Sequence, residues 1–518
     1  MIAAVLQVRL TKGRDDGKKA QSRHVKTREQ IPTAAEFADV ARSTAGKQFQ
    51  YTLAGRIAFA SNETGTCRGL MRNLLIQLVI TLGACGVLIQ NAGADERLRL
   101  IVETDAGGDP DDEQSLVRFL LYANEWDVEG IIANRPEARR GENQNLERTG
   151  LGITRRLILA YGQCYSNLVQ HDSRYPAPDL LLRRTVAGYD DVEDGVNLIL
   201  SSVDRGDPRP VWFLNWGTIQ GCAVSSLKRA LDRVRRERGE AGYGAFKKRL
   251  RLSSDNQFEP HTSTMQPPFE LWVDTFRPPV DGKRWYHRFS TLTATAGGFD
   301  LRRDVLSGHG PLGALYPTNT THWQKEGDTM TFLYLVPTGM NDPMQPGWGS
   351  WAGRYGTNET FSGLRYFWAN QKDQWRGSNH RDNTLARWAA DLQNDFRARL
   401  NWCVTSGSNA NHSPVALVNA KPGKEIVLVT GATGSTLRLS AEGSYDPDGN
   451  KMSYEWFNYQ EAGTYGSAIA LTDSTSKTLL FKIPKDAKEK TIHILLRVTD
   501  DGAPPLAAYR RIVVQVSK

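Results

Sequence analysis

The sequence predicts an α/β domain followed by a smaller all-β domain. Between residues 98 and 252, short runs rich in β-formers alternate with longer runs of helical periodicity. This alternation is typical of a parallel sheet covered by helices. After residue 423, short alternating runs recur with turn residues between them. That pattern is typical of a β-sandwich of about 100 residues.

The α/β elements follow one another closely along the chain. Strands are expected at 98–103, 127–133, 210–214 and 249–252, and helices at 113–124, 146–161, 195–203 and 223–238. The first helix places Leu116, Phe119 and Leu120 on one face, as packing against a sheet requires. From 282 to 411 the sequence is rich in tryptophan and turn residues, so we expect long loops over the α/β core.

A linker is expected at 412–423, between an α/β domain at 95–411 and a β domain at 424–518. The strands of the β domain are expected at 425–429, 436–441, 452–457, 492–498 and 512–516. The DPDG run at 446–449 resembles a turn of PKD- and cadherin-like modules, which can bind Ca²⁺. Turn formation alone also selects these residues and is the favoured explanation.

The net charge of +8 is concentrated in the first fifth of the chain. Residues 1–94 hold 13 of the 65 Lys+Arg but only 6 of the 57 Asp+Glu, a net +7, which leaves +1 for residues 95–518. A nucleic-acid partner is therefore not expected, because it needs a basic face on a folded domain. With 40% hydrophobic and 24% charged residues, the chain is neither disordered overall nor a polytopic membrane protein.

Residues 71–94 have the layout of a secretory signal peptide. Arg72 supplies a short positive region, residues 74–89 form an uncharged apolar run, and residues 92–94 are a small-residue cleavage site. The apolar run is short for a membrane span, although an uncleaved anchor would have the same pattern. We expect no membrane span after cleavage and a periplasmic or extracellular protein.

Translation is expected to start at Met71, which would make residues 1–70 a spurious or dispensable extension. An alternative to cleavage after Ala94 is lipid anchoring at Cys85, but the apolar residues that follow Cys85 disfavour it. The mature chain would keep three widely spaced cysteines, which form neither a zinc pattern nor a disulfide framework. One disulfide and buried free thiols are both open for Cys164, Cys222 and Cys403.

Six acidic residues crowd into 11 positions at the first predicted strand-to-helix turn: Glu103, Asp105, Asp109, Asp111, Asp112 and Glu113. Like charges this close raise one another's pKa unless a cation or hydrogen bonds neutralise them. Ca²⁺ takes about 6–8 oxygen ligands and would relieve the repulsion. The Gly-Gly pair at 107–108 permits a tight turn. An acidic loop with a helix-capping Asp is the simpler alternative, but the turn lies where parallel sheets bind ligands.

The same segment resembles a known family. TDAGGDPDDEQSLVRFL, followed by VEGIIA, resembles the nucleoside hydrolase fold, and more closely the secreted nucleoside hydrolase-like family described as cellulose-binding. Further runs similar to that family are GHGPLGALYP, EGDTMTFLYLVPTGMNDP, GWGSWAGRYG, GSYDPDGNKMSYEWFNYQEAGTY and IHILLRVTDDGAPPL. The resemblance covers residues 98–516 and implies a mostly parallel open sheet with flanking helices.

The resemblance also implies a Ca²⁺ site. In nucleoside hydrolases the N-terminal Asp cluster binds Ca²⁺, one Asp activates the attacking water, and sugar hydroxyls complete the metal shell. By position, Asp105 matches the base, which is also a metal ligand. Asp112 matches the bidentate metal ligand and Asp111 the ribose-binding Asp. Asp328 precedes an apolar helical run and matches the C-terminal metal ligand.

The chain departs from that family pattern in several places. Glu103 stands where the first Asp is usual. Two residues are inserted before the Asp pair, so Asp109 is a further candidate ligand. Thr218 lies where a Thr-Asn pair is usual, and a backbone carbonyl there is a candidate ligand. The Asn after the second strand has no clear match, and the nearby candidates are Asn134, Asn143 and Asn145. Specificity for a nucleobase is therefore not implied.

Six residues outside the acidic turn are candidate sugar contacts: Asp255, Asn256, Asn341, Asp342, Trp348 and Trp351. The first four lie in turn-like runs, where turn chemistry alone would select them. The two tryptophans flank glycines, which would let their rings lie flat against a sugar. Packing in the core is the alternative for both rings.

Two functions fit this scaffold, because fold does not decide function. The first is a secreted Ca²⁺-dependent hydrolase of an N- or O-glycosyl bond, in which Asp105 activates a metal-bound water. The second is a non-catalytic protein that binds cellulose or another polysaccharide through its tryptophan-rich loops. The six acids favour the hydrolase. A sugar or polysaccharide ligand is expected in either case, and a homodimer is left open.

Overall fold

The computed structural model describes residues 97–108, 110–138, 147–189, 192–217, 225–254, 267–275, 278, 289, 298–318 and 324–517. The expectations for residues 1–94 and for Cys222 lie outside these ranges. Among the described residues, no helix combines the length and apolar character that crossing a membrane demands.

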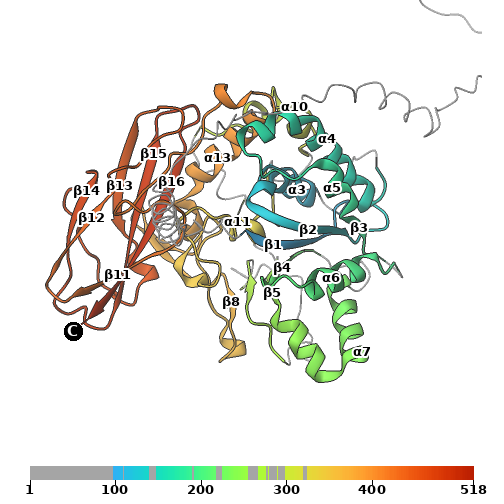
Figure 1. Cartoon of the computed structure of the whole chain (residues 1–518), viewed down its shortest axis with the longest axis horizontal. Helices are drawn as coiled ribbons and strands as arrows, with labels where there is room; N and C mark the ends of the chain where they lie inside the picture. The colour runs from blue at the N-terminus through green and yellow to red at the C-terminus, as the bar shows by residue number, and fades with distance from the viewer. Residues whose placement is uncertain are drawn as a thin grey trace, which may run out of the picture. The chain divides into compact units, whose positions relative to one another are not determined.

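An eight-stranded sheet forms the centre of the α/β domain, in the order β3-β2-β1-β4-β5-β6-β8-β7 (Figure 1). All neighbours are parallel except β7 and β8. The strands are β1 (Leu98–Thr104), β2 (Trp126–Ala133), β3 (Thr185–Ala187), β4 (Val211–Trp216), β5 (Leu250–Ser254), β6 (Trp272–Asp274), β7 (Gly356–Thr357) and β8 (Tyr366–Trp368). The predicted mostly parallel α/β fold is confirmed.

Strand β1 is buried on both faces, and its side chains alternate between two cores. Leu100 and Val102 pack with α3, α4 and α13, whereas Ile101 packs with α6 and α7 on the other face (Figure 1). The helices are α3 (Asp111–Leu121), α4 (Gly150–His171), α5 (Pro178–Arg183), α6 (Asp194–Asp204), α7 (Ser226–Lys248), α10 (Gly310–Ala314), α11 (Thr329–Leu333), α12 (Asn383–Ala386) and α13 (Ala389–Trp402).

Several short elements complete the α/β domain, and the loops expected at 282–411 contain some of them. These are the hairpin of β9 (Asp373–Trp375) and β10 (Ser378–His380), a π-helix at Arg302–Leu306, and 3-10 turns at Ala123–Glu125, Pro346–Trp348, Glu359–Phe361 and Gly407–Asn409. The well-formed helix α13 also lies there, within a range where only loops were expected.

The second domain is a β-sandwich, as predicted. One sheet has the order β11-β16-β15-β13 and the other pairs β12 with β14. The strands are β11 (Val427–Ala432), β12 (Thr436–Ser440), β13 (Met452–Asn458), β14 (Thr478–Lys482), β15 (Thr491–Asp500) and β16 (Ala507–Ser517), with a 3-10 turn at Gln460–Ala462. Trp456, Phe481 and Ile494 are among the residues of its core.

The two domains share a buried polar contact at Asp373. Its carboxylate accepts hydrogen bonds from Arg354 (2.7 Å), Arg387 (3.2 Å) and the hydroxyl of Tyr459 (2.7 Å). Tyr459 belongs to the sandwich, while the other three residues belong to the α/β domain. Trp388 packs edge-on against the ring of Tyr459 beside this cluster.

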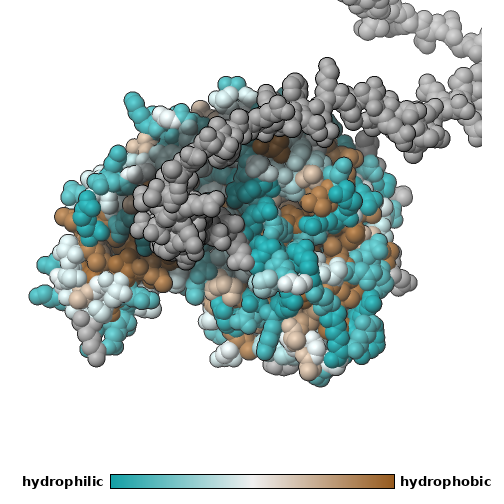
Figure 2. Space-filling model, viewed as in Figure 1, coloured by the Kyte–Doolittle hydropathy of each residue, from teal (hydrophilic) through white to brown (hydrophobic). Residues whose placement is uncertain are grey.

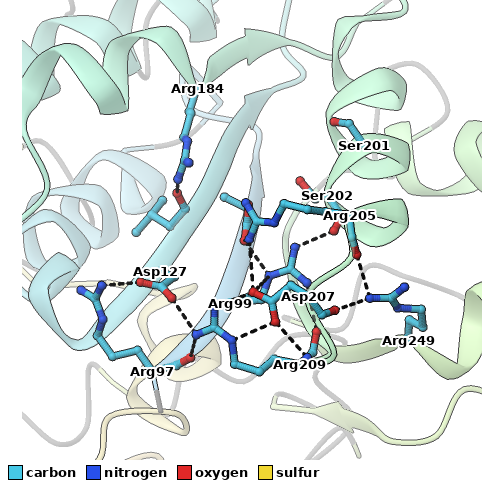
Figure 3. A network of polar contacts seen from close by, with 12 residues as sticks. Arg97, Arg99, Asp127, Arg184, Ser201, Ser202, Arg205, Asp207, Arg209 and Arg249 are labelled. Atoms are coloured by element: carbon cyan, nitrogen blue, oxygen red, sulfur yellow. Dashed lines mark hydrogen bonds and ion pairs between the residues drawn. The ribbon is translucent and has the colours of Figure 1, made fainter. Parts of the chain in front are cut away.

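A second polar network joins the amino ends of the central strands (Figure 3). Arg99 donates to Glu129 at 2.7 Å and to the carbonyl of Ser202 at 2.6 Å. Arg209 pairs with Asp127 at 2.7 Å and with Asp207 at 2.6 Å. These bonds tie β1 and β2 to α6 and to the loop before β4.

The basic face of α7 is neutralised by acidic neighbours. Arg233 pairs with Glu237 at 3.0 Å and Arg238 with Asp204 at 2.6 Å. The surface over this helix is largely hydrophilic (Figure 2). Arg233 and Arg238 on this surface therefore each have a carboxylate partner.

Candidate metal centre

The acidic turn lies at the carboxyl end of β1, where the strand order switches sides: β2 and β3 lie on one side of β1 and β4 on the other. Open parallel sheets bind ligands at such a point. Helix α3 begins two residues earlier than predicted, so Asp111, Asp112 and Glu113 form its first turn. Negative side chains are stabilised there by the helix dipole. Gly107 has a φ of +95°, which favours glycine in this turn.

Three buried carboxylates meet at this end of the sheet. One oxygen each from Asp111, Asp112 and Asp328 lies within 4.8 Å of the others. Asp328 is the residue that precedes α11, as the sequence indicated. The structure therefore brings together two of the expected ligands, and it adds Asp111, which was expected to contact sugar instead.

Asp112 is the most crowded of these side chains. Its Oδ1 accepts hydrogen bonds from the hydroxyl of Thr104 and from the backbone N–H of Asp105 at 3.1 Å. Its carboxyl also contacts that of Asp105. Burial, followed by the charges of Asp328, Asp105 and Asp111, raises the pKa of Asp112 well above its usual value. Such repulsion is what a bound cation relieves.

Two basic side chains reach into the same acidic group. Arg135 donates from Nη2 to Asp105 Oδ2 at 2.8 Å and from Nε to the Asp105 carbonyl at 3.0 Å. Lys325 Nζ lies 3.3 Å from Asp111 Oδ2. The sequence analysis missed both cations. Both residues are close in sequence to predicted parts of the site, which could have identified them: Arg135 follows the second strand closely, and Lys325 precedes Asp328 by three residues.

The charges of this group fit a divalent cation. Asp105, Asp111, Asp112 and Asp328 carry four formal negative charges, and Arg135 and Lys325 carry two positive ones, which leaves −2. Carboxylate oxygens are the ligands that hard cations such as Ca²⁺ and Mg²⁺ prefer. The donor set and its residual charge are therefore suited to such an ion.

The neighbouring strand ends add uncharged polar groups. Asn134 follows β2, and its backbone N–H donates to the carbonyl of Thr104 at 3.0 Å. Its side chain is 1% exposed, and neither amide atom has a partner among the described residues. Asn215, which the sequence analysis missed, is buried on β4 opposite Glu103. Asn134 thus lies at the same edge of the sheet as the carboxylates, with a buried amide that has no partner among the described residues.

Gly217 leaves room for the carboxylate of Asp105. A Cβ at Gly217 would lie 3.0 Å from Asp105 Oδ1, and the residue has a φ of +82°. A side chain there would press directly on the carboxylate and strain the backbone. The absence of a side chain at Gly217 is therefore required for the observed position of the Asp105 carboxylate.

The two glutamates of the acidic turn have structural roles. Glu103 points to the opposite face of the sheet, where Oε1 accepts from the backbone N–H of Ser226 at 2.7 Å. Burial raises the pKa of Glu103 to about 7. Glu113 accepts from the backbone N–H of Gly107 at 3.0 Å. These residues fix α7 and the turn, respectively.

Four predicted site residues lie outside the described ranges: Asp109, Thr218, Asp255 and Asn256. Their proposed roles stay predictions.

Asn341 and Asp342 lie away from the acidic site, and their contact with a sugar stays a prediction. Asn341 lines a cavity with Leu98, at the amino end of β1, whereas the carboxylates lie at its carboxyl end. Its amide donates to the carbonyl of Tyr334 at 3.0 Å. Asp342 accepts from the N–H of Met344 at 2.8 Å. Both residues serve the turn that contains them.

The expected flat, exposed tryptophan rings are also not found. Trp351 is 4% exposed and belongs to the main core, so the expectation of an exposed ring is wrong. Trp348 is half-buried, with its ring edge-on to His493 at 4.9 Å. Trp348 lies between Gly347 and Gly349, whereas Trp351 lies between Ser350 and Ala352.

Comparisons with known proteins agree with this architecture. Residues 99–355 match the family model described as "Cellulose-binding Sde182, nucleoside hydrolase-like domain". Residues 436–516 match that of the "Cellulose-binding protein Sde0182, C-terminal domain". No curated protein matches the chain.

A solved structure is similar over most of the chain. It is a nucleoside hydrolase-related hypothetical protein from Saccharophagus degradans, described as associated with carbohydrate metabolism. The identity is 32% and the TM-score 0.64, with 81% of this chain and 100% of that chain covered. The chain therefore belongs to the cellulose-binding Sde182 family, with its nucleoside hydrolase-like domain and its C-terminal domain.

Proposed function

We propose that this protein is a divalent-cation-dependent hydrolase of a glycosyl bond, with Ca²⁺ as the expected ion. The observation that supports the proposal is the buried group of Asp111, Asp112 and Asp328, with Asp105 against it, at the carboxyl end of the central strand. A residual charge of −2 in a nucleoside hydrolase-like domain is difficult to explain by folding alone, because buried like charges are costly.

The ion would be held by Asp111, Asp112 and Asp328, where it would lower the pKa of a coordinated water and orient sugar hydroxyls. Asp105 is the carboxylate able to take a proton from the attacking water. Arg135 holds Asp105 from two sides, through its carboxylate and its carbonyl. The amide of Asn134 is available to a sugar hydroxyl. The surrounding negative charge favours the positive charge that develops on the anomeric carbon.

The proposal is tested with Asp105→Asn. Hydrolysis of a panel of nucleosides and aryl glycosides should require a divalent cation and stop in EDTA. In Asp105→Asn, kcat should fall at least about 100-fold. Asp342→Asn is the matched control, because Asp342 accepts a single turn hydrogen bond at the other end of β1. Unchanged turnover in Asp105→Asn would refute the assigned base.

Export is part of this proposal. The signal-peptide pattern at 71–94 and the cellulose-binding description of the family support a periplasmic or extracellular protein. N-terminal sequencing of the native protein should begin at Asp95. Peptides from residues 1–70 in that material would contradict both the expected start and the cleavage.

Polysaccharide binding without catalysis is a second candidate function, favoured by a separate cavity. A cavity of about 460 Å³ lies between the domains, lined by Trp402, Tyr509, Glu125, Asp395 and Lys424, among others. Its size is that of ordinary ligand pockets, and aromatic rings with polar groups are what sugars contact. This function predicts retention on insoluble cellulose in EDTA and weaker retention in Lys424→Ala. Equal retention of that variant would argue against the cavity.

A further inference from the structure

Cys164 and Cys403 lie side by side in the described structure, although 239 positions separate them in the sequence. Cys164 is on α4, and Cys403 follows the last residue of α13. Both are buried, with 0% and 3% exposure, and their thiols hydrogen-bond each other. No sequence pattern identifies this pair, because the spacing reflects the packing of two distant helices.

The glycine at the start of α10 shows how close the pair is. A Cβ on Gly310 would lie 3.4 Å from the sulfur of Cys164 and 3.8 Å from the Cβ of Cys403. Gly310 has a φ of +75°. Both cysteines therefore lie against the same small residue, and Asn167, one turn after Cys164 on α4, donates to the carbonyl of Cys403 at 3.0 Å.

We propose that Cys164 and Cys403 form a disulfide when the protein folds in an oxidising compartment. Disulfides persist in exported proteins, so this inference rests on the export proposed above and not on the hydrolytic activity. Both thiols are covered in the folded chain, so the bond forms during folding and is then shielded from reductants.

The chemistry requires an external disulfide as the oxidant, such as oxidised glutathione or a thiol oxidoreductase. The thiol of Cys403 lowers the pKa of Cys164 by hydrogen bonding to it, so Cys164 is the more readily formed thiolate. Its sulfur attacks one sulfur of the oxidant and releases one thiolate. Cys403 then loses its proton, attacks the Cys164 sulfur and releases the second thiolate. The protein loses two protons and two electrons, and the oxidant becomes two thiols.

The bond would fix α13, whose other contacts reach the carboxylate site. Gln393 of α13 accepts from Arg118 at 2.9 Å, and Arg118 pairs with Glu326 at 2.5 Å. Glu326 precedes Asp328 by two residues. The cysteine pair thus lies at one end of a helix that braces the segment carrying Asp328.

The test is peptide mapping of the protein refolded from denaturant in a buffer of oxidised and reduced glutathione, then denatured in an alkylating agent. The expected product is a Cys164–Cys403 linked peptide, two hydrogens lighter than the separate peptides, with Cys222 alkylated. Recovery of Cys164 and Cys403 as alkylated single peptides would overturn the proposal. A link from either residue to Cys222 would overturn it as well.

Cys222→Ser is the matched control and should leave the linked peptide in place. Melting of the wild-type protein should drop on the order of 5 °C with reductant, and the double variant Cys164→Ala/Cys403→Ala should show no such dependence. If that variant does not fold, the peptide map of the wild-type protein still decides. None of these measurements uses hydrolytic activity or EDTA, so failure here is distinct from failure of the proposed hydrolase.

Discussion

The guanidinium of Arg135 lies 2.8 Å from the carboxylate of Asp105. It also binds the Asp105 carbonyl at 3.0 Å. A fixed cation therefore neutralises the side chain that the proposed mechanism uses as its base. A buried ion pair of this kind is held by two bonds and is shielded from solvent, so it orients Asp105 more firmly than an exposed pair would.

Removing this arginine should strengthen cation binding. Arg135→Gln makes the formal charge of the group −3, so the affinity for Ca²⁺ should rise by about 10-fold or more, which is about 1.4 kcal/mol. Calorimetric titration with Ca²⁺ measures it. Arg148→Gln is a suitable control, because Arg148 donates to the carbonyl of Ala138 and not to a carboxylate of the site. An unchanged or weaker affinity in Arg135→Gln would show that the arginine does not compete with the cation.

Loss of Asp112 should have opposite effects with and without a cation. In EDTA, Asp112→Asn should raise the melting temperature, because it removes a buried charge that Asp328, Asp105 and Asp111 repel. With Ca²⁺, only the wild-type protein should gain stability, since an ion that binds the folded state stabilises it. Thermal melts with and without Ca²⁺ measure both effects. Equal Ca²⁺-dependent shifts in the two proteins would place the ion elsewhere.

Acid should destabilise the protein through His493. Burial, then the charges of Arg511 and Arg354, lowers the pKa of His493 to about 3, from an ordinary value of 6.5. Between these values the unfolded chain binds a proton that the folded chain does not. Stability from this group is therefore present above pH 6.5 and is lost as the pH falls toward 3, at up to about 1.4 kcal/mol per pH unit.

His493→Gln should flatten this part of the pH dependence. Urea unfolding of both proteins at intervals from pH 7 to 4 measures the difference in slope. His380 is exposed, so His380→Gln should leave the slope unchanged. Parallel curves for wild-type protein and His493→Gln would contradict the assignment.

The shared contact at Asp373 should be critical for stability. Asp373→Asn removes the charge that faces Arg354 and Arg387 and leaves two buried guanidinium groups without a carboxylate. The expected loss is about 3–5 kcal/mol in the free energy of unfolding, measured by urea denaturation. Asp232→Asn, which breaks the exposed pair with Lys228, should cost less than about 1 kcal/mol. Similar losses in the free energy of unfolding of both variants would show that the Asp373 cluster stabilises the protein no more than an exposed ion pair does.

The sequence predicted those elements whose residue pattern follows directly from burial and charge. The apolar run of β1 and the acids after it identified the strand, the turn and the approximate start of α3. It could not identify Arg135 or Lys325 as partners of the acids, because an arginine or lysine in a loop has no periodicity. The three-residue strands β6 and β8 are too short to show alternation. For Trp351, the local sequence allows either burial or exposure, and packing with the rest of the core decides.

The turn between β1 and α3 is closed at both of its ends by side chains. Asp112 binds the backbone N–H of Asp105, and Glu113 binds that of Gly107. The length of chain between these anchors can therefore change without moving the acids. The tip of the turn lies between these anchors. Residues at the tip could therefore be replaced to change the contacts with a substrate, while the anchored acids keep their positions.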